Sequence, residues 1–310
     1  MDRIAVVTDS SANLPPELAQ QWGISVVPAL LVLGGDTFRD GLDITPGELY
    51  RQLRATKRIP TTSAPSIGDF VRVYAALGQE AAGVVSIHPP PQLTATYSTA
   101  VAASQLVDDV AIRVINCDVV AMALGFVVLE AARAAAAASE RGDSAAVALD
   151  AVVARAAEVA SRVNLMAAID TLQYLYLGGR IGGAAALLGT ALQIKPILYV
   201  ADGRAEVLAK PRTKAKATRF MLQQMAGQVD GQRLHAAVLH ADALEEAEEL
   251  RQRIAQQFDC VELYVAEFTP VMGAHTGPGL LGVAFYAEPS PLPQGETAVQ
   301  CNPKGSRGQG

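Results

Sequence analysis

The stretch IAVVTDSS, residues 4–11, joins a short β-branched run to a turn that carries hydroxyl groups. The run over residues 4–8 is typical of a buried strand in a parallel sheet. Ligands of open α/β sheets bind beyond the carboxyl ends of the strands, so the turn is expected to face a ligand or a second domain. Local turn chemistry is the alternative, because Asp9 and Ser10 can cap nearby backbone groups.

Strand-like and helix-like segments alternate from this stretch to residue 163. Thr45 and Glu48 form a capping pattern at one helix start, and Ser66 and Asp69 form another. Further strands are expected over residues 24–27, 30–33, 83–87 and 111–115, and alanine-rich helices over residues 119–139 and 144–163. This repetition predicts a mostly parallel sheet with helices on its faces.

The second half of the chain has a different pattern. Asp202 and Gly203 separate two apolar runs, which indicates a β-hairpin and therefore antiparallel pairing. We expect an α/β protein with an N-terminal α/β domain over residues 1–163 and a C-terminal α/β domain with antiparallel strands over residues 164–288. Residues 289–310, rich in Pro, Gly and Gln, are expected to form a disordered tail.

The composition argues against several classes of protein. The 310 residues suffice for two domains, and half of them are apolar. A net charge of −6 argues against nucleic-acid binding, which depends on Lys and Arg. The three cysteines are far apart and show no zinc-ligand spacing, so no metal, cofactor or disulfide framework is expected. This cysteine pattern fits the reducing cytoplasm.

Neither a signal peptide nor a membrane span is expected. The first residues show no signal-peptide pattern and are predicted to form the first strand. The longest apolar stretch, residues 119–129, is soon followed by Glu130 and Arg133. It is too short to cross a bilayer, so a buried helix is expected.

Two loop segments supply candidate ligand donors. Thr61, Thr62 and Ser63 stand between two prolines, which predicts a stiff loop with fixed donors, although loops favour these residues in any case. Thr94 is expected to open a helix, where a hydroxyl and free N–H groups can bind an anion. An ordinary threonine N-cap is the alternative.

Three other features carry possible chemistry. His275 lies in a Gly/Pro-rich segment, where it can donate to an anion or act as a general base, although a lone exposed histidine usually does neither. The glycine-rich run over residues 178–183 lacks the spacing of a nucleotide-binding loop. A small basic cluster at Lys210, Arg212 and nearby lysines faces either solvent or an acidic partner.

In combination, these segments resemble the DegV family of bacterial fatty-acid-binding proteins. The resemblance runs over residues 4–288 and rests on the order of six motifs, each weak alone. They are VTDS at residues 7–10, TSAPS at 62–66, TATY at 94–97, VIN at 114–116, LQYL at 172–175 leading to GGRI at 178–181, and HTGPG at 275–279.

The resemblance implies two α/β domains with a long-chain fatty acid in an apolar tunnel between them. By position, Thr62, Thr94 and His275 match residues that hold the carboxylate, with Thr61 and Ser63 beside them. It also implies a separate ATP-dependent fatty-acid kinase as a partner, which converts the bound acid to an acyl phosphate. Arg180 and Arg212 match arginines that serve this partner.

The chain departs from the family pattern near the head group. Ala64 stands where Gln is common, Thr94 and Ala95 stand where Ser-Gly is usual, and Asn116 replaces Asp. Ala95 adds a side chain at a point where the backbone can approach a ligand. The head-group geometry is therefore expected to differ in detail from that of the family.

The main hypothesis is a cytoplasmic fatty-acid carrier with no catalytic cycle of its own. Burial gives about 0.8 kcal/mol per methylene, so a sixteen-carbon chain has roughly 12 kcal/mol available before binding costs. The rival hypothesis is a hydrolase or acyl-transfer enzyme that uses a hydroxyl and His275. Against it, no GxSxG elbow is present, and the sequence pairs no acidic residue with His275.

Overall fold

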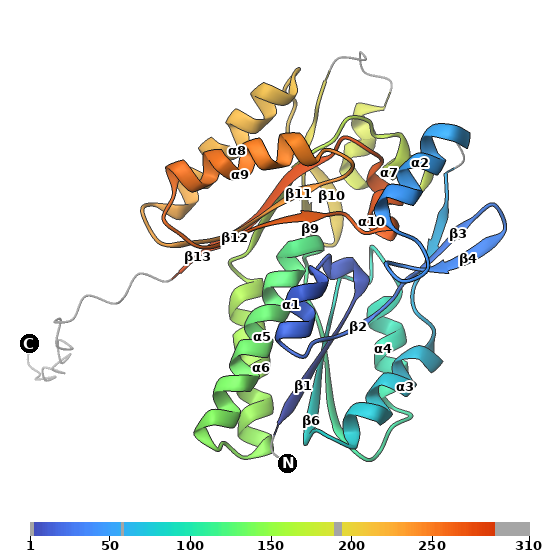
Figure 1. Ribbon diagram of the computed structural model, residues 1–310, viewed down its shortest axis with the longest axis vertical. Coiled ribbons are helices and arrows are strands. Elements are labelled where there is room, and N and C mark those ends of the chain that lie inside the picture. The colour runs from blue at the N-terminus through green and yellow to red at the C-terminus, as the bar shows by residue number, and fades with distance from the viewer. Residues whose placement is uncertain (1–2, 57–58, 189–193, 289–310) are drawn as a thin grey trace, which may run out of the picture.

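The computed structural model describes residues 3–56, 59–188 and 194–288. The predicted tail over residues 289–310, including Cys301, lies outside these residues. Two larger sheets form the centres of two halves of the molecule, and a small third sheet lies beside the second half (Figure 1). Cys117 and Cys260 are free thiols.

The first sheet is parallel throughout and has the order β2-β1-β6-β7, as the alternating sequence pattern predicted. Its strands are β1 (Ile4–Asp9), β2 (Ser25–Val27), β6 (Gly83–His88) and β7 (Ala111–Asn116). Helices α5 (Ala121–Arg141) and α6 (Ala145–Ala160) lie on one side, and α3 (Ile67–Gly78) and α4 (Thr96–Ser104) on the other (Figure 1). Every residue of β1 and β6 is buried, as expected for strands covered on both faces.

The second sheet is mixed and has the order β10-β9-β8-β13-β11-β12. Its strands are β8 (Asn164–Ala168), β9 (Ile197–Ala201), β10 (Arg204–Ala209), β11 (Leu234–His240), β12 (Cys260–Glu267) and β13 (Leu281–Ala287). Asp202 and Gly203 both adopt positive φ, 49° and 67°, and form the predicted hairpin turn between β9 and β10. Helices α8 (Lys214–Val229) and α9 (Leu244–Gln257) cover the outer face (Figure 1).

The third sheet was not predicted. It is antiparallel, with the order β4-β3-β5, and its strands are β3 (Leu30–Leu33), β4 (Asp36–Arg39) and β5 (Thr61–Ser63). The expectation of a stiff loop over residues 61–63 was therefore wrong. The three polar residues form a strand because β3, about thirty residues earlier in the chain, supplies the pairing partner.

Short elements connect the sheets. They are α1 (Pro16–Gln21), α2 (Pro46–Thr56), α7 (Gln173–Leu177), α10 (Pro270–Thr276) and two 3-10 turns, η1 (Ser10–Ala12) and η2 (Gly182–Leu187). The predicted capping pairs are present. Thr45 and Glu48 exchange hydrogen bonds before α2, and Ser66 and Asp69 do so at the start of α3.

The apolar stretch predicted as a buried helix lies in α5. By length and composition this helix could cross a membrane, but 78% of its most apolar part is buried inside the protein. It packs on β1 and also contacts the second sheet through Phe126, whose ring meets the edge of Tyr286 at 5.5 Å between centroids. The helix is therefore part of the core shared by the two halves.

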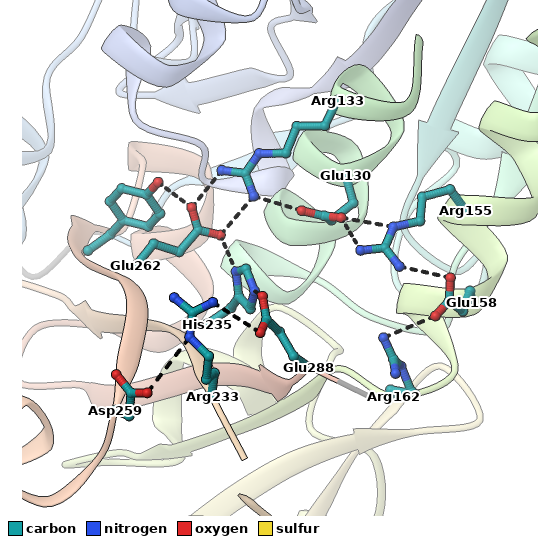
Figure 2. Close-up of polar contacts among 11 residues, drawn as sticks. Glu130, Arg133, Arg155, Glu158, Arg162, Arg233, His235, Asp259, Glu262 and Glu288 are labelled. Carbon is teal, nitrogen blue, oxygen red and sulfur yellow. Dashed lines mark hydrogen bonds and ion pairs between the residues drawn. The ribbon is translucent and has the colours of Figure 1, made fainter. Parts of the chain in front are cut away.

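A network of ion pairs fastens α5 and α6 to the second sheet (Figure 2). Arg133 on α5 donates to Glu130 at 2.7 Å and to Glu262 on β12 at 2.6 and 3.0 Å. Arg155 on α6 binds the other oxygen of Glu130, and His235 on β11 lies 2.7 Å from Glu262. Burial alone would raise the pKa of Glu262, but hydrogen bonds from His235, Arg133 and Tyr264 lower it to about 2.

Glu130, His235 and Glu262 could also be considered as metal ligands, since their donor atoms lie within 4.8 Å of one another. The guanidinium of Arg133 already bridges the two carboxylates, as Figure 2 shows. A positive group thus occupies the position that a metal ion would need. The cluster is best explained as a structural ion-pair network.

Candidate functional site

A cavity of about 380 Å³ lies between the two halves. Its apolar wall includes Leu165 and Ala167 of β8 and Leu198 of β9, together with residues of α10. On the side of the first half it is bounded by Asp9 at the end of β1 and by Pro89 just after β6. The cavity therefore opens at the carboxyl edge of the parallel sheet, where ligands of α/β proteins bind.

Hydroxyls and one imidazole meet at this cavity. Thr62 Oγ1 lies 2.7 Å from His275 Nε2, although the two residues are 213 positions apart in the sequence. Thr62 comes from β5, and His275 comes from the last turn of α10 and not from the loop that the Gly/Pro content suggested. Pro270 at the start of that helix and Gly277 just after it confine it to two turns.

The surroundings of His275 define its protonation. Burial, with a smaller contribution from the positive charge of Arg180, lowers the pKa of His275 to about 4, so the ring is neutral at pH 7. Nδ1 has no hydrogen-bond partner among the described residues and packs closely on Gly178, where an added Cβ would lie 2.5 Å away. We therefore assign the proton to Nε2, because a proton on Nδ1 would be a buried and unpaired donor.

This tautomer sets the direction of the hydrogen bond. His275 Nε2–H donates to Thr62 Oγ1, and the hydroxyl proton of Thr62 is left free to donate to a third group. An acceptor in the cavity, such as a carboxylate oxygen, meets that requirement. The pair is thus arranged to present one directed hydroxyl donor without a formal charge.

Thr94 and Ser63 also line the cavity. Thr94 does not open the helix, because α4 begins two residues later, with Ala95 in the N-cap position. Its Oγ1 lies 2.8 Å from Thr96 Oγ1, so the two hydroxyls form a pair beside the cavity. Thr61, the remaining member of the predicted hydroxyl set, does not contribute to the lining.

The two candidate arginines differ in position. Arg180 lines the cavity and is half-buried. Its Nε donates to the carbonyl of Leu93 at 3.0 Å, and its Nη1 donates to the carbonyl of Gly178 at 2.5 Å. Arg212 is exposed and lies outside the cavity lining. The fold thus brings Thr62, Ser63, Thr94, His275 and Arg180 to one cavity, and leaves Thr61 and Arg212 outside it.

Sequence reasoning missed a buried polar chain next to the cavity. Tyr74 donates to Ser86 at 2.8 Å, Ser86 lies 2.7 Å from His88 Nε2, and His88 Nδ1 lies 2.7 Å from Asp9. Asp9 also accepts from the N–H of Ser11 at 3.0 Å, as predicted for a local cap, while both residues also line the cavity. The sequence offered one sign of this polar chain: His88 stands two residues after Ser86, so both side chains lie on the same face of β6.

The chain Ser86–His88–Asp9 has the connectivity of a hydrolytic triad but not its exposure. Ser86 and His88 are completely buried, and neither lines the cavity. Ser86 Oγ accepts from Tyr74, so it presents no nucleophile to a substrate. The network instead holds Asp9, whose backbone segment forms part of the cavity wall.

An apolar cavity with a directed, uncharged hydroxyl donor defines a site for an amphipathic small molecule. A long apolar tail suits the walls, and a small polar head suits Thr62 and its neighbours. The chain belongs to the DegV family: the family described as "Uncharacterised protein, DegV family" matches residues 3–288.

Curated relatives support this membership along almost the whole chain. A DegV domain-containing protein from Streptomyces coelicolor is 38% identical over 282 residues, which cover 90% of this chain and 97% of the relative. Protein DegV from Bacillus subtilis is 31% identical over 283 residues, which cover 91% and 98% of the two chains.

Solved structures show the same fold. A DegV family protein from Thermus thermophilus, described for its fatty acid binding, has a TM-score of 0.84 and 34% identity, and the match covers 92% of this chain and 100% of that one. DegV from Bacillus subtilis, described as a fatty acid binding protein, also has a TM-score of 0.84, with 30% identity, 93% coverage of this chain and 100% of that one. Both matches span the two halves described above.

Proposed function

We propose that this protein binds a long-chain fatty acid in the cavity, in the cytoplasm, and presents the carboxylate to a separate ATP-dependent fatty-acid kinase. The observation that carries the proposal is the cavity itself, which is apolar along its walls and carries the neutral Thr62–His275 pair. The two related structures described as fatty-acid-binding proteins give it independent support.

The tail would supply most of the binding free energy. Each buried methylene contributes about 0.8 kcal/mol, so a chain of sixteen carbons offers on the order of 12 kcal/mol before the entropic costs of association. Aliphatic side chains such as Leu165, Leu198 and Val271 surround the space that the tail would fill. The head group then needs orientation more than additional affinity.

The head group would be held by neutral donors. In this proposal the hydroxyls of Thr62 and Thr94 donate to the carboxylate, Ser63 lies beside them, and His275 fixes the direction of the Thr62 hydroxyl. Arg180 is close, but its Nε and Nη1 already donate to backbone carbonyls. A carboxylate without an arginine ion pair keeps its negative charge available for reaction.

The chemistry would then take place on the partner. A carboxylate oxygen of the bound acid attacks the γ-phosphorus of ATP held by the kinase, the bond to the β-phosphate oxygen breaks, and acyl phosphate and ADP result. In this proposal the exposed Arg212 faces the partner, and Arg180 lies at the cavity where the two proteins meet.

The rival hypothesis of a hydrolase gains no support at His275. A general base of that kind needs an orienting acceptor on its second nitrogen, and Nδ1 of His275 has none among the described residues. Of the two hypotheses, the carrier is therefore the one that this site favours.

A titration of delipidated protein tests the proposal. Palmitate or oleate should bind, and the methyl ester of the same acid should bind at least about tenfold more weakly, because it lacks the charged acceptor. Absence of binding by both acids would contradict the proposal. Acyl phosphate formed with ATP and no kinase would show instead that the protein has catalytic activity of its own.

A further inference from the structure

The chain between β6 and α4 forms a thin wall of the cavity. Leu93, Thr94 and Ala95 line the cavity, while Pro91, Gln92 and Ala95 are exposed on the outside. We call residues 91–95 the mouth segment. A single layer of chain therefore separates the cavity from solvent at this point.

Arg180 holds the mouth segment from the opposite half of the molecule. Its hydrogen bond to the Leu93 carbonyl, 3.0 Å long, crosses from the region after β8 to the segment before α4. Among the described residues it is the one hydrogen bond that joins the mouth segment to residues 164–288. Its second bond, to the Gly178 carbonyl, fixes the guanidinium in place.

The β9–β10 hairpin makes the second contact with the mouth segment. Gly203 at its turn is buried, and an added Cβ would lie 3.0 Å from the Cβ of Gln92. The mouth segment itself is compact, because the N–H groups of Leu93 and Thr94 both reach the carbonyl of Pro90. It can therefore be displaced as a unit about its ends.

The two halves are joined much more firmly elsewhere. The Arg133 network begins nine residues beyond the cavity-lining Ala121, roughly 14 Å further along α5. Closer to the cavity, Asn13 receives a bond from the N–H of Thr269 at 2.9 Å and donates to the Glu267 carbonyl at 3.1 Å. Separation of the halves would break all of these bonds, whereas displacement of the mouth segment breaks one hydrogen bond between the halves.

We propose that Arg180 is a positioning residue that latches the mouth segment, and that the ligand loads and leaves by displacement of this segment while the two halves stay together. This inference rests on the proposed fatty-acid binding. It gives Arg180 a role within the carrier itself, separate from any contact with a partner.

A kinetic measurement separates this role from a head-group contact. A latch contributes to the barrier in both directions, so its removal raises the loading and release rates together and leaves Kd nearly unchanged. A contact with the carboxylate contributes to the bound state, so its removal raises Kd through the release rate alone. The loss of one hydrogen bond from a charged donor corresponds to a rate change of about tenfold.

The test uses the delipidated full chain and cis-parinaric acid in stopped-flow fluorescence at pH 8, where His275 stays neutral. Arg180→Ala should raise both rates about tenfold and leave Kd within about threefold, and Arg180→Lys should recover part of the effect. Arg204→Ala removes an exposed arginine of the neighbouring hairpin and should match the wild type. A higher Kd with an unchanged loading rate in Arg180→Ala would overturn the latch.

A reversible cross-link tests the route directly. Gln92→Cys with Gly203→Cys, in a Cys260→Ser and Cys301→Ser background, places two Cβ atoms about 3.0 Å apart, a little closer than a disulfide requires. The oxidised form should exchange the acid at least about tenfold more slowly than the same protein after reduction. Equal exchange in both forms would overturn the route. Failure of the unsubstituted protein to bind the acid would instead count against the proposed function, because Gly203→Cys itself introduces strain at a residue with a φ of 67°.

Discussion

Removal of the Thr62 hydroxyl should weaken fatty-acid binding while the fold remains intact. Thr62→Val keeps the shape and the β-branch of the side chain, so β5 and its pairing with β3 are preserved. The variant loses the hydroxyl that His275 orients at 2.7 Å. A hydrogen bond to a charged carboxylate contributes about 1.5–3 kcal/mol, which corresponds to roughly a 10- to 150-fold increase in Kd.

The assay is isothermal titration of delipidated protein with palmitate, supported by urea unfolding of each variant. Thr61→Val is the matched control, because Thr61 is a threonine of the same strand that does not line the cavity. It should bind palmitate as the wild type does, and Thr62→Ser should retain most of the affinity. Equal affinities of Thr62→Val and the wild type, or equal losses in both valine variants, would refute the proposed head-group site.

Three other perturbations have defined outcomes. Burial raises the pKa of Asp40 to about 6, so the charged form of this carboxyl disfavours folding. In urea titrations, Asp40→Asn should gain up to about 3 kcal/mol of unfolding free energy above pH 7 and almost nothing below about pH 3. A gain independent of pH would contradict this. Arg133→Met should lower the unfolding free energy by about 3–5 kcal/mol, because it leaves buried carboxylates without their partner. Arg233→Met on the surface should lower it by less than about 1 kcal/mol. Similar losses in both variants would count against a structural role for the network. Because the pKa of His275 is lowered to about 4, the ring stays neutral between pH 6 and 9, and palmitate affinity should not change with its titration in that range. A rise in affinity toward pH 6 that disappears in His275→Gln would show instead that the ring is charged at the site.

The regular part of the fold could be predicted because its signals are local. The β-branched run before residue 9, the capping pairs Thr45–Glu48 and Ser66–Asp69, and the Asp202–Gly203 turn each fix a boundary from neighbouring residues alone. The small third sheet was not predicted because β5 is short and polar. Its residues form a strand only because they pair with β3, about thirty residues earlier in the chain.

The site could be predicted only in part, for a related reason. The family pattern nominated Thr62, Thr94 and His275, and the fold brings all three to one cavity. The pairing of Thr62 with His275 and the latch from Arg180 to Leu93 join segments 213 and 87 residues apart, so neither appears in any local pattern. Thr61 looked equivalent to Thr62 in the sequence, but only Thr62 and Ser63 of β5 line the cavity, and no local pattern shows which end of this strand reaches it.

In the proposed function, the cavity holds a long-chain fatty acid. Organic extraction of the purified protein, followed by mass spectrometry, tests it most directly. About one equivalent of long-chain fatty acid per chain is expected, or stoichiometric uptake of added palmitate or oleate by the delipidated protein. A protein that carries no fatty acid after purification and takes up neither acid would contradict the proposed function.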